Sequence, residues 1–520
     1  MSRNRHMLAS FLLAVSLLLM PCLEVPLSAA PAKTATSSTA AKKRKPAARK
    51  PVRKKALAKT RSSKATVAKA TSTTRRRTTK RRRASASRRV AISAAAREQA
   101  TENIAQSLSA RVDGLIEQPG ALIPFFEQLY RQEQKQGTSP VRILHYGDSH
   151  TAADLWTSSI RNAFQTRFGD GGSGFSHAGS PWRGYRRFDV SGRASLRWQS
   201  AGLIGKASLR GDEFQGLSGV SVSTQFPKEW ITLQARCSSL EVFYLQQPGG
   251  GRFLLYDNDE LVAEHSTDGE YGPGILQLPT ASTEEHEFRI VTADAAPVRL
   301  FGWVAEQAHG VTYEPLGING AQASTTARWN PELFSAYVSH RDPSLIVVAY
   351  GTNESGHTIW DYDSYYAEFD ALLKRIRKAS PTAAILVVGP PDRQTFVRSR
   401  GWATAPRLEL VMRAQRDAAR ANRVAFWDMY ARMGGRSSMK TWVQAGLAAH
   451  DHVHFSGAGY RRLGETLYQD LMVQYNEFQE LRQQWTSAAS DELPSSQPAG
   501  NHEPAPRPDS ATREEGFQEK

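Results

Sequence analysis

The chain has 520 residues and a formal net charge of +17, but its positive charge is concentrated in one segment. Residues 33–97 contain 24 Lys or Arg and no Asp or Glu, whereas residues 98–520 contain 41 basic and 49 acidic residues. The part that is expected to fold therefore has a net charge of about −8, and nearly all of the basicity lies in one segment. The only cysteines are Cys22 and Cys237, which excludes a disulfide-rich scaffold.

Residues 1–32 have the layout of a secretory signal peptide. Arg3 and Arg5 precede an apolar run at residues 7–20, and the small residues Ala30-Pro31-Ala32 follow. We expect cleavage there, a periplasmic or secreted protein, and no transmembrane span after removal of the signal. One alternative is an uncleaved anchor, for which the run is short. The other is lipidation at Cys22, which Pro21 disfavours.

Residues 33–95 consist almost entirely of Ala, Lys, Arg, Ser, Thr and Pro. Such a segment cannot bury enough apolar surface to fold, so it is predicted to be a disordered basic linker. Two interpretations stay open, a solvated linker and an electrostatic tether to anionic envelope polymers. The signal peptide disfavours a third, nucleic-acid binding. The polar residues 485–520 are predicted to form a disordered tail.

Strand and helix patterns alternate in two separated parts of the chain, residues 96–185 and 309–484. In the first part, helical spacing over residues 96–137 precedes a strand at 141–146 and a helix at 153–168. In the second, strands alternate with helices at residues 345–350, 363–378, 384–388, 407–421 and 424–427, and a last helix follows Gly457. This order predicts an α/β fold with a parallel sheet between two helical layers.

Residues 186–308 lie between these parts and show a different pattern. Apolar residues alternate with period two in short runs at 220–226, 230–236, 240–245, 253–256, 275–278, 287–291 and 298–303. Short strands at this spacing predict a β-sandwich inserted in the α/β domain.

Four motifs carry the chemistry. Gly147-Asp148-Ser149 places a hydroxyl where a strand ends, and ligands of open α/β sheets bind at such ends. Asn319-Gly320-Ala321 follows the insertion, and Gly351-Thr352-Asn353-Glu354 ends a second strand. Asp451-His452-Val453-His454 precedes the last helix.

A serine hydroxyl needs an adjacent base to act as a nucleophile. His454 is the candidate base, and Asp451 can accept its other ring N–H from the same loop. Each residue also has a simpler interpretation. Ser149 is a possible helix cap, and Gly320 and Asn353 are possible turn residues.

Three further observations leave alternatives open. His450, His452 and His454 alternate like metal ligands, although no carboxylate or cysteine cluster is identifiable to complete such a site. His150 is a competing base. Three aromatic side chains either line a sugar site or pack internally: Trp156, Trp182 and Tyr185.

The four motifs, in this order, resemble the four blocks of the SGNH (GDSL-type) hydrolases over residues 140–475. The strings at residues 144–152 and 348–355 look most similar to bacterial peptidoglycan O-acetylesterases, which carry a carbohydrate-binding-module-like β-domain between the first two blocks. Two residues depart from the pattern, His150 in place of leucine and Glu354 in place of the usual aspartate. These departures blur the assignment within the superfamily.

The resemblance implies a flavodoxin-like three-layer α/β/α fold and a catalytic triad of Ser149, Asp451 and His454. It also implies an oxyanion hole formed by the backbone N–H groups of Ser149 and Gly320 and the side-chain amide of Asn353. No cofactor or metal is expected.

The expected function is that of a serine esterase acting on O-acetylated cell-wall polysaccharide. Peptidoglycan acetylated at the muramic acid 6-hydroxyl is the favoured substrate. A polysaccharide O-acetyltransferase on the same scaffold and a non-catalytic glycan-binding envelope protein are the alternatives.

Overall fold

The computed structural model describes residues 92–110, 114, 116–202, 204, 212–280 and 282–491. The chain divides into two units, Met1–Ala86 and Ser87–Lys520, and every described residue belongs to the second. The predicted signal peptide, nearly all of the predicted basic linker and most of the predicted tail lie outside the described residues. Among the described residues, no helix combines the length and apolar character that crossing a bilayer requires.

A six-stranded sheet in the order β1-β18-β15-β14-β2-β13 forms the centre of the α/β part. Its parallel strands are β2 (Val141–Gly147), β13 (Val311–Gly317), β14 (Leu345–Ala349), β15 (Ala384–Val388) and β18 (Ala425–Trp427), and β1 (Ile116–Glu117) is antiparallel at the edge. In chain order the parallel strands lie 2-1-3-4-5, which is the flavodoxin-like arrangement. The predicted fold class is thereby confirmed.

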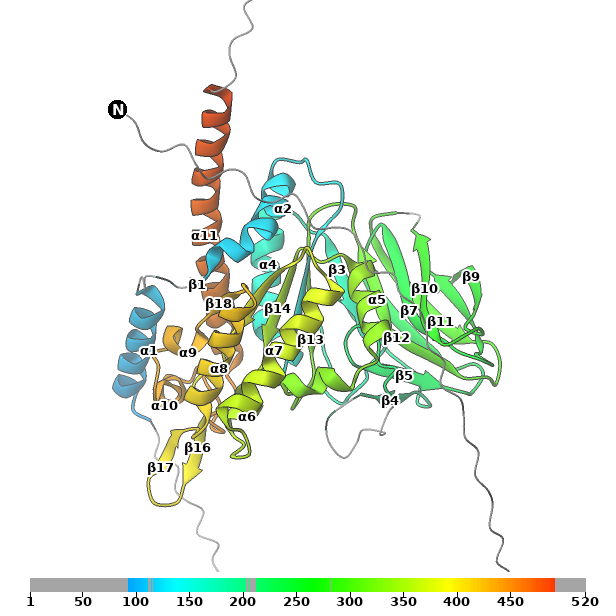
Figure 1. Ribbon diagram of the computed structural model, residues 1–520. Coiled ribbons are helices and arrows are strands. Elements are labelled where there is room, and N and C mark those ends of the chain that lie inside the picture. The colour runs from blue at the N-terminus through cyan, green and yellow to red at the C-terminus, as the bar shows by residue number, and fades with distance from the viewer. Residues whose placement is uncertain are drawn as a thin grey trace, which may run out of the picture. The chain divides into compact units, whose positions relative to one another are not determined.

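Helices cover both faces of this sheet. Successive residues of a strand point to opposite faces, so each strand contributes apolar side chains to both helical layers. On one side, Ile346 and Val348 pack in a cluster that includes α5 (Pro331–Arg341), α7 (Tyr362–Ala379) and α8 (Leu408–Ala421). On the other side, Leu345 and Val347 pack with α2 (Ile123–Glu133), α4 (Leu155–Phe168) and the start of α11 (Gly457–Asp491). Figure 1 shows α7 and α8 crossing in front of the strands.

The α/β part contains further elements around these layers. They are α1 (Ala94–Ser109), η1 (Pro119–Leu122), α3 (Ser149–Ala152), η2 (Ala323–Arg328), α6 (Thr352–Ser355), β16 (Gln394–Val397), β17 (Gly401–Thr404), α9 (Met429–Arg432) and α10 (Ser438–Gln444). Helix α11 continues to Asp491, past residue 485, where the predicted tail begins.

Two antiparallel sheets form the inserted part. The first has the order β10-β7-β12-β5-β4 with β3 paired to β12, and the second has the order β6-β11-β8-β9. A buried apolar cluster with side chains from both sheets, including Ile231, Phe253 and Val242, lies between them. The strands are β3 (Gly172–Ser176), β4 (Gln199–Ala201), β5 (Ser221–Thr224), β6 (Trp230–Arg236), β7 (Ser239–Gln246), β8 (Arg252–Asp257), β9 (Glu260–Ser266), β10 (Gly272–Pro279), β11 (Glu285–Thr292) and β12 (Val298–Glu306).

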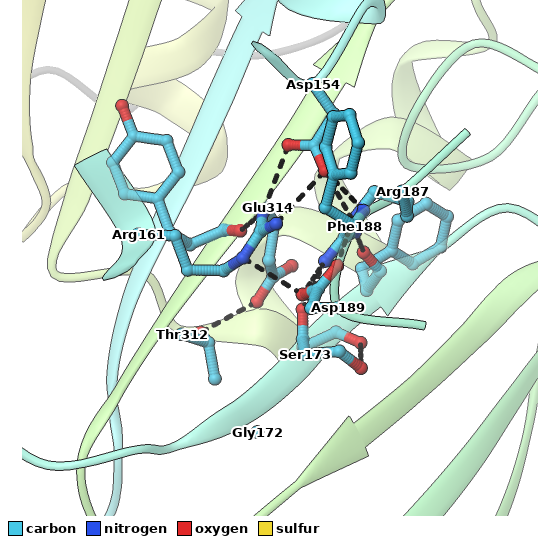
Figure 2. A network of polar contacts seen from close by, with 12 residues as sticks. Asp154, Arg161, Gly172, Ser173, Arg187, Phe188, Asp189, Thr312 and Glu314 are labelled. Atoms are coloured by element: carbon cyan, nitrogen blue, oxygen red, sulfur yellow. Dashed lines mark hydrogen bonds and ion pairs between the residues drawn. The ribbon is translucent and has the colours of Figure 1, made fainter. Parts of the chain in front are cut away.

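A buried network of charged side chains ties α4 to β3 and to the loop that follows it (Figure 2). Arg161 contacts Asp154 at 3.0 Å and Asp189 at 3.1 Å, and Arg187 contacts Asp189 at 2.6 Å. Arg187 also donates to the carbonyl oxygens of Phe175 and Ser173. Burial raises the pKa of Asp189, but the guanidinium groups of Arg187 and Arg161 outweigh it, so the pKa is lowered. The network therefore holds its charges as ion pairs.

Candidate active site

The site lies where the strand order of the parallel sheet reverses, between β2 and β14. In open α/β sheets ligands bind at this point, outside the carboxyl ends of the strands. Ser149 lies two residues after the end of β2, as the first residue of α3, and Thr352 and Asn353 follow β14 at the start of α6. The topology thus brings together two motifs that are about two hundred residues apart in the sequence.

Ser149, His454 and Asp451 form a continuous chain of hydrogen bonds. Ser149 Oγ lies 2.9 Å from His454 Nε2, and His454 Nδ1 lies 2.7 Å from Asp451 Oδ2. Asp451 Oδ1 also accepts the backbone N–H groups of Val453 and His454, each at 3.0 Å. This geometry lets the imidazole take the serine proton while the carboxylate orients the ring.

The Asp451 carboxyl is stabilised in its charged form. Burial raises its pKa, but hydrogen bonds from the His454 side chain and from the backbone N–H groups of His454 and Val453 outweigh that effect, so the pKa is lowered. A charged carboxylate is the stronger acceptor for the ring N–H. The side chain is 49% exposed, so solvent screens part of this interaction.

A hydrogen bond links Asn353 to the loop that carries Gly320. The Asn353 side-chain amide donates to the carbonyl oxygen of Ala321, the residue after Gly320, at 2.8 Å. An amide nitrogen carries two N–H donors, so this bond leaves one of them for another acceptor. Gly320 has a φ of +79°, which glycine adopts without strain.

Glu354 joins two of the motif loops from a fully buried position. Its Oε1 accepts the N–H of Ala323 at 2.9 Å, and its Oε2 accepts the N–H of Gly351 at 3.1 Å. Burial raises its pKa to about 7, although the backbone N–H donors act in the opposite direction. The longer side chain that replaces the usual aspartate thus connects the loop after β14 to η2.

Asp148 is a second buried carboxyl beside the site. It caps α3 by accepting the N–H of His150 at 2.9 Å. Burial raises its pKa to about 6, while hydrogen bonds from the His150 N–H and from Thr352 lower it in part. Asp148 therefore positions the turn that presents Ser149.

His150 contacts a different partner from His454. Its Nδ1 lies 2.7 Å from the hydroxyl of Tyr460, and its ring centroid lies 5.3 Å from that of His454. Burial lowers its pKa to about 3, so the ring is neutral. His454 Nε2 is placed to accept the Ser149 hydroxyl proton, whereas the His150 ring bonds Tyr460, which favours His454 over His150 as the base.

His452 also has its own partners. Its Nδ1 lies 2.7 Å from Gln394 Oε1, and its ring stacks on Trp402 with a centroid distance of 4.0 Å. His452 and His454 therefore face different groups, although they alternate in the sequence.

The three aromatic candidates differ in their surroundings. Trp156 is buried in the core and packs edge-on against His145. Trp182 and Tyr185 pack on each other and on His177. Packing is therefore the better interpretation for Trp156.

Sequence reasoning missed Arg393, which contacts the loop after β14. Its guanidinium donates to the carbonyl oxygen of Thr352 at 2.6 Å. Arg393 follows the carboxyl end of β15, in the segment Pro390-Pro391-Asp392-Arg393. Polar residues at the end of a third parallel strand were the signal that could have identified it.

The chain matches the GDSL-like Lipase/Acylhydrolase family over residues 286–462. The matched range includes Gly320, Asn353, Asp451 and His454, and Ser149 precedes it. No curated protein matches.

Solved structures with similar chains include a peptidoglycan O-acetylesterase, 29% identical, with a TM-score of 0.61, covering 70% of this chain and 100% of that chain. A family two carbohydrate esterase from Cellvibrio japonicus is 10% identical, with a TM-score of 0.26, covering 55% of this chain and 98% of that chain.

Proposed function

Because this chain belongs to the GDSL/SGNH hydrolase family, we propose that it is a serine esterase that removes O-acetyl groups from a cell-wall glycan. The favoured substrate is peptidoglycan acetylated at the muramic acid 6-hydroxyl. One observation carries the proposal, the hydrogen-bonded chain from Ser149 through His454 to Asp451, with distances of 2.9 and 2.7 Å.

The reaction begins when Ser149 Oγ attacks the acetyl carbonyl carbon and His454 Nε2 takes the serine proton. The negative charge that develops on the carbonyl oxygen is stabilised by the N–H groups of Ser149 and Gly320 and by the Asn353 amide. The intermediate collapses as the sugar oxygen leaves with the proton from His454. The products of this half-reaction are a free sugar hydroxyl and an acetylated Ser149.

Water completes the cycle. His454 takes a proton from water as the water oxygen attacks the acetyl carbon, and the bond between that carbon and Ser149 Oγ breaks. Acetate leaves, and His454 returns the proton to Ser149. Asp451 stabilises the imidazolium in both half-reactions.

Two features support a cell-wall substrate. The first is the 29% identity to a peptidoglycan O-acetylesterase across the whole length of that chain. The second is the sequence of residues 1–95, which predicts export followed by a basic segment. In this proposal the exported protein works in the periplasm or outside the cell, and residues 33–95 tether it to anionic envelope polymers.

An acetate-release assay on O-acetylated peptidoglycan, xylan and exopolysaccharide tests the proposal. The full chain is expected to release acetate most rapidly from peptidoglycan, and Ser149→Ala is expected to fold normally and release none. Activity retained by Ser149→Ala would refute the mechanism, and release from xylan alone would refute the substrate. Transfer of the acetyl group to an acceptor sugar would identify a transferase, and binding without turnover a glycan-binding protein.

A further inference from the structure

The β16–β17 hairpin exposes large apolar side chains beside the site. Phe396 is 65% exposed, Trp402 39% and Val397 38%. Phe396 and Trp402 lie directly opposite each other on the two strands, with ring centroids 5.6 Å apart in an edge-on arrangement. Exposed apolar groups of this size typically mark a surface that binds a partner or ligand.

The hairpin is attached to the loop that carries the triad histidine, residues 449–456, here called the His454 loop. The Gln394 N–H donates to the carbonyl oxygen of His452 at 3.0 Å, and the Gln394 side chain bonds the His452 ring. Trp402 stacks on the same ring with an interplanar angle of 11°. Because His452 follows Asp451, Trp402 contacts the loop that carries two of the three triad residues.

The residue directly before the hairpin contacts the other side of the site. Arg393, which precedes β16, donates to the carbonyl oxygen of Thr352, the residue before Asn353. In Figure 1 the hairpin projects beside α6, from the same end of the sheet. It therefore stands next to both loops that supply candidate site residues.

The aromatic pair lies on the face of the hairpin that is turned toward the His454 loop. Alternate residues of a strand share a face, so Gln394 and Phe396 lie on the same side. Gln394 and Trp402 both contact His452. Phe396, opposite Trp402, extends this face outward from the site.

The tip of the hairpin is cationic. Arg398 and Arg400 are exposed in the turn, which the Arg400 N–H closes by donating to the carbonyl oxygen of Val397 at 3.0 Å. Residues 393–407 contain four arginines and no acidic residue. Aromatic rings offer an apolar surface to sugar C–H groups, and guanidinium groups pair with carboxylates. Together they suit a polysaccharide chain that carries carboxylates.

We propose that the β16–β17 hairpin is a substrate-binding arm for an acidic glycan chain. A sugar next to the acetylated one lies against Phe396 and Trp402, and a carboxylate of the same chain pairs with Arg398 or Arg400. This proposal rests on the proposed esterase function, because the glycan chain that the hairpin holds presents its acetyl group to Ser149.

The test compares kcat/KM of the full chain on soluble O-acetylated peptidoglycan fragments with kcat/KM on a small aryl acetate. Phe396→Ala is expected to lower the ratio of the two values about tenfold, a typical loss for a dominant contact residue. Phe396→Tyr is expected to restore it, because a phenol ring offers the same face. Trp402 is left intact because it stacks on His452. Trp485→Ala is the matched control, since Trp485 is an exposed aromatic side chain (56%) near the end of α11.

The charged tip is tested with Arg398→Ser/Arg400→Ser. This variant is expected to lower kcat/KM on acetylated peptidoglycan fragments more than on acetylated xylan, which is neutral in its main chain. An equal effect on the two polymers would refute the proposed pairing with carboxylates.

The outcomes separate the two proposals. If the wild-type protein deacetylates peptidoglycan and Phe396→Ala has the same ratio of the two kcat/KM values, the substrate-binding role of the hairpin is refuted and the esterase function is not. An equal fall of the ratio in Trp485→Ala, or no rescue by Phe396→Tyr, would also refute the role of the hairpin. A wild-type chain that hydrolyses the aryl acetate but no acetylated polymer would overturn both proposals.

Discussion

Asn353 donates its side-chain amide to the carbonyl oxygen of Ala321 at 2.8 Å, and so connects the loop after β14 to the loop after β13. The bond orients the amide and holds it beside the loop of Gly320, whose N–H is another oxyanion donor in the proposed mechanism. This hydrogen bond thus links the two loops that carry two of the three proposed donors.

Replacing Asn353 with alanine removes both the proposed donor and the bond to Ala321. We expect kcat for acetate release to fall about a hundred- to a thousand-fold, the usual loss for one oxyanion-hole donor. Steady-state kinetics on an aryl acetate measures this change. Asn162→Ala, an exposed asparagine on α4, is the control. A kcat within about twofold of wild type in Asn353→Ala would rule out the donor role.

Glu354 makes stability depend on pH. Its folded pKa of about 7 lies above the ordinary value of 4.5, so the folded protein binds this proton more tightly than the unfolded chain. The resulting stabilisation is fully present below about pH 4.5 and is lost as the pH rises through about 7. We expect the melting temperature of wild type to fall relative to that of Glu354→Gln across this window. Parallel curves for the two proteins would contradict the assignment.

The buried Asp154 is expected to be important for stability. Asp154→Asn keeps the left-handed backbone conformation at this position (φ +49°), which asparagine tolerates. The substitution leaves Arg161 without one of its two carboxylate partners in a buried site. Breaking a buried ion pair costs about 3 kcal/mol of unfolding free energy, which chemical denaturation measures.

The exposed pair between Asp259 and Arg289 is the control for that experiment, because Asp259 is 92% exposed. Asp259→Asn is expected to change the unfolding free energy by less than about 1 kcal/mol. A loss of similar size in both variants would show that burial of the Asp154 network has no special effect.

Much of the fold could be predicted because strands that pack against apolar neighbours have a recognisable pattern of apolar residues in the sequence. Strands β14, β15 and β18 are entirely apolar, and β2 is apolar apart from Arg142 and His145, since helices cover both faces of the sheet. Strand β13 was missed because Thr312, Glu314 and Pro315 interrupt its apolar pattern. Buried Glu314 pairs with Arg341, from α5, at 2.6 Å and accepts a hydrogen bond from the Thr312 hydroxyl at 3.0 Å. A partner from a distant helix leaves no local signal.

The same reasoning separates the parts of the site that could be predicted from those that could not. Ser149, Asn353 and Glu354 follow strands, so their convergence follows from the parallel topology. The contacts of Gln394 and Trp402 with His452 depend on how a hairpin folds back onto a loop some fifty residues later in the sequence. Strand pairing alone does not encode that placement.

The most direct test of the esterase mechanism is to look for the acetyl-enzyme. The full chain is mixed with O-acetylated peptidoglycan fragments, quenched in acid during turnover, digested and examined by mass spectrometry. The mechanism predicts one acetyl group on the peptide that contains Ser149, and neither acetylation nor acetate release in Ser149→Ala. Acetate release at the wild-type rate from Ser149→Ala, with no acetylated Ser149 in the wild-type chain, would contradict it.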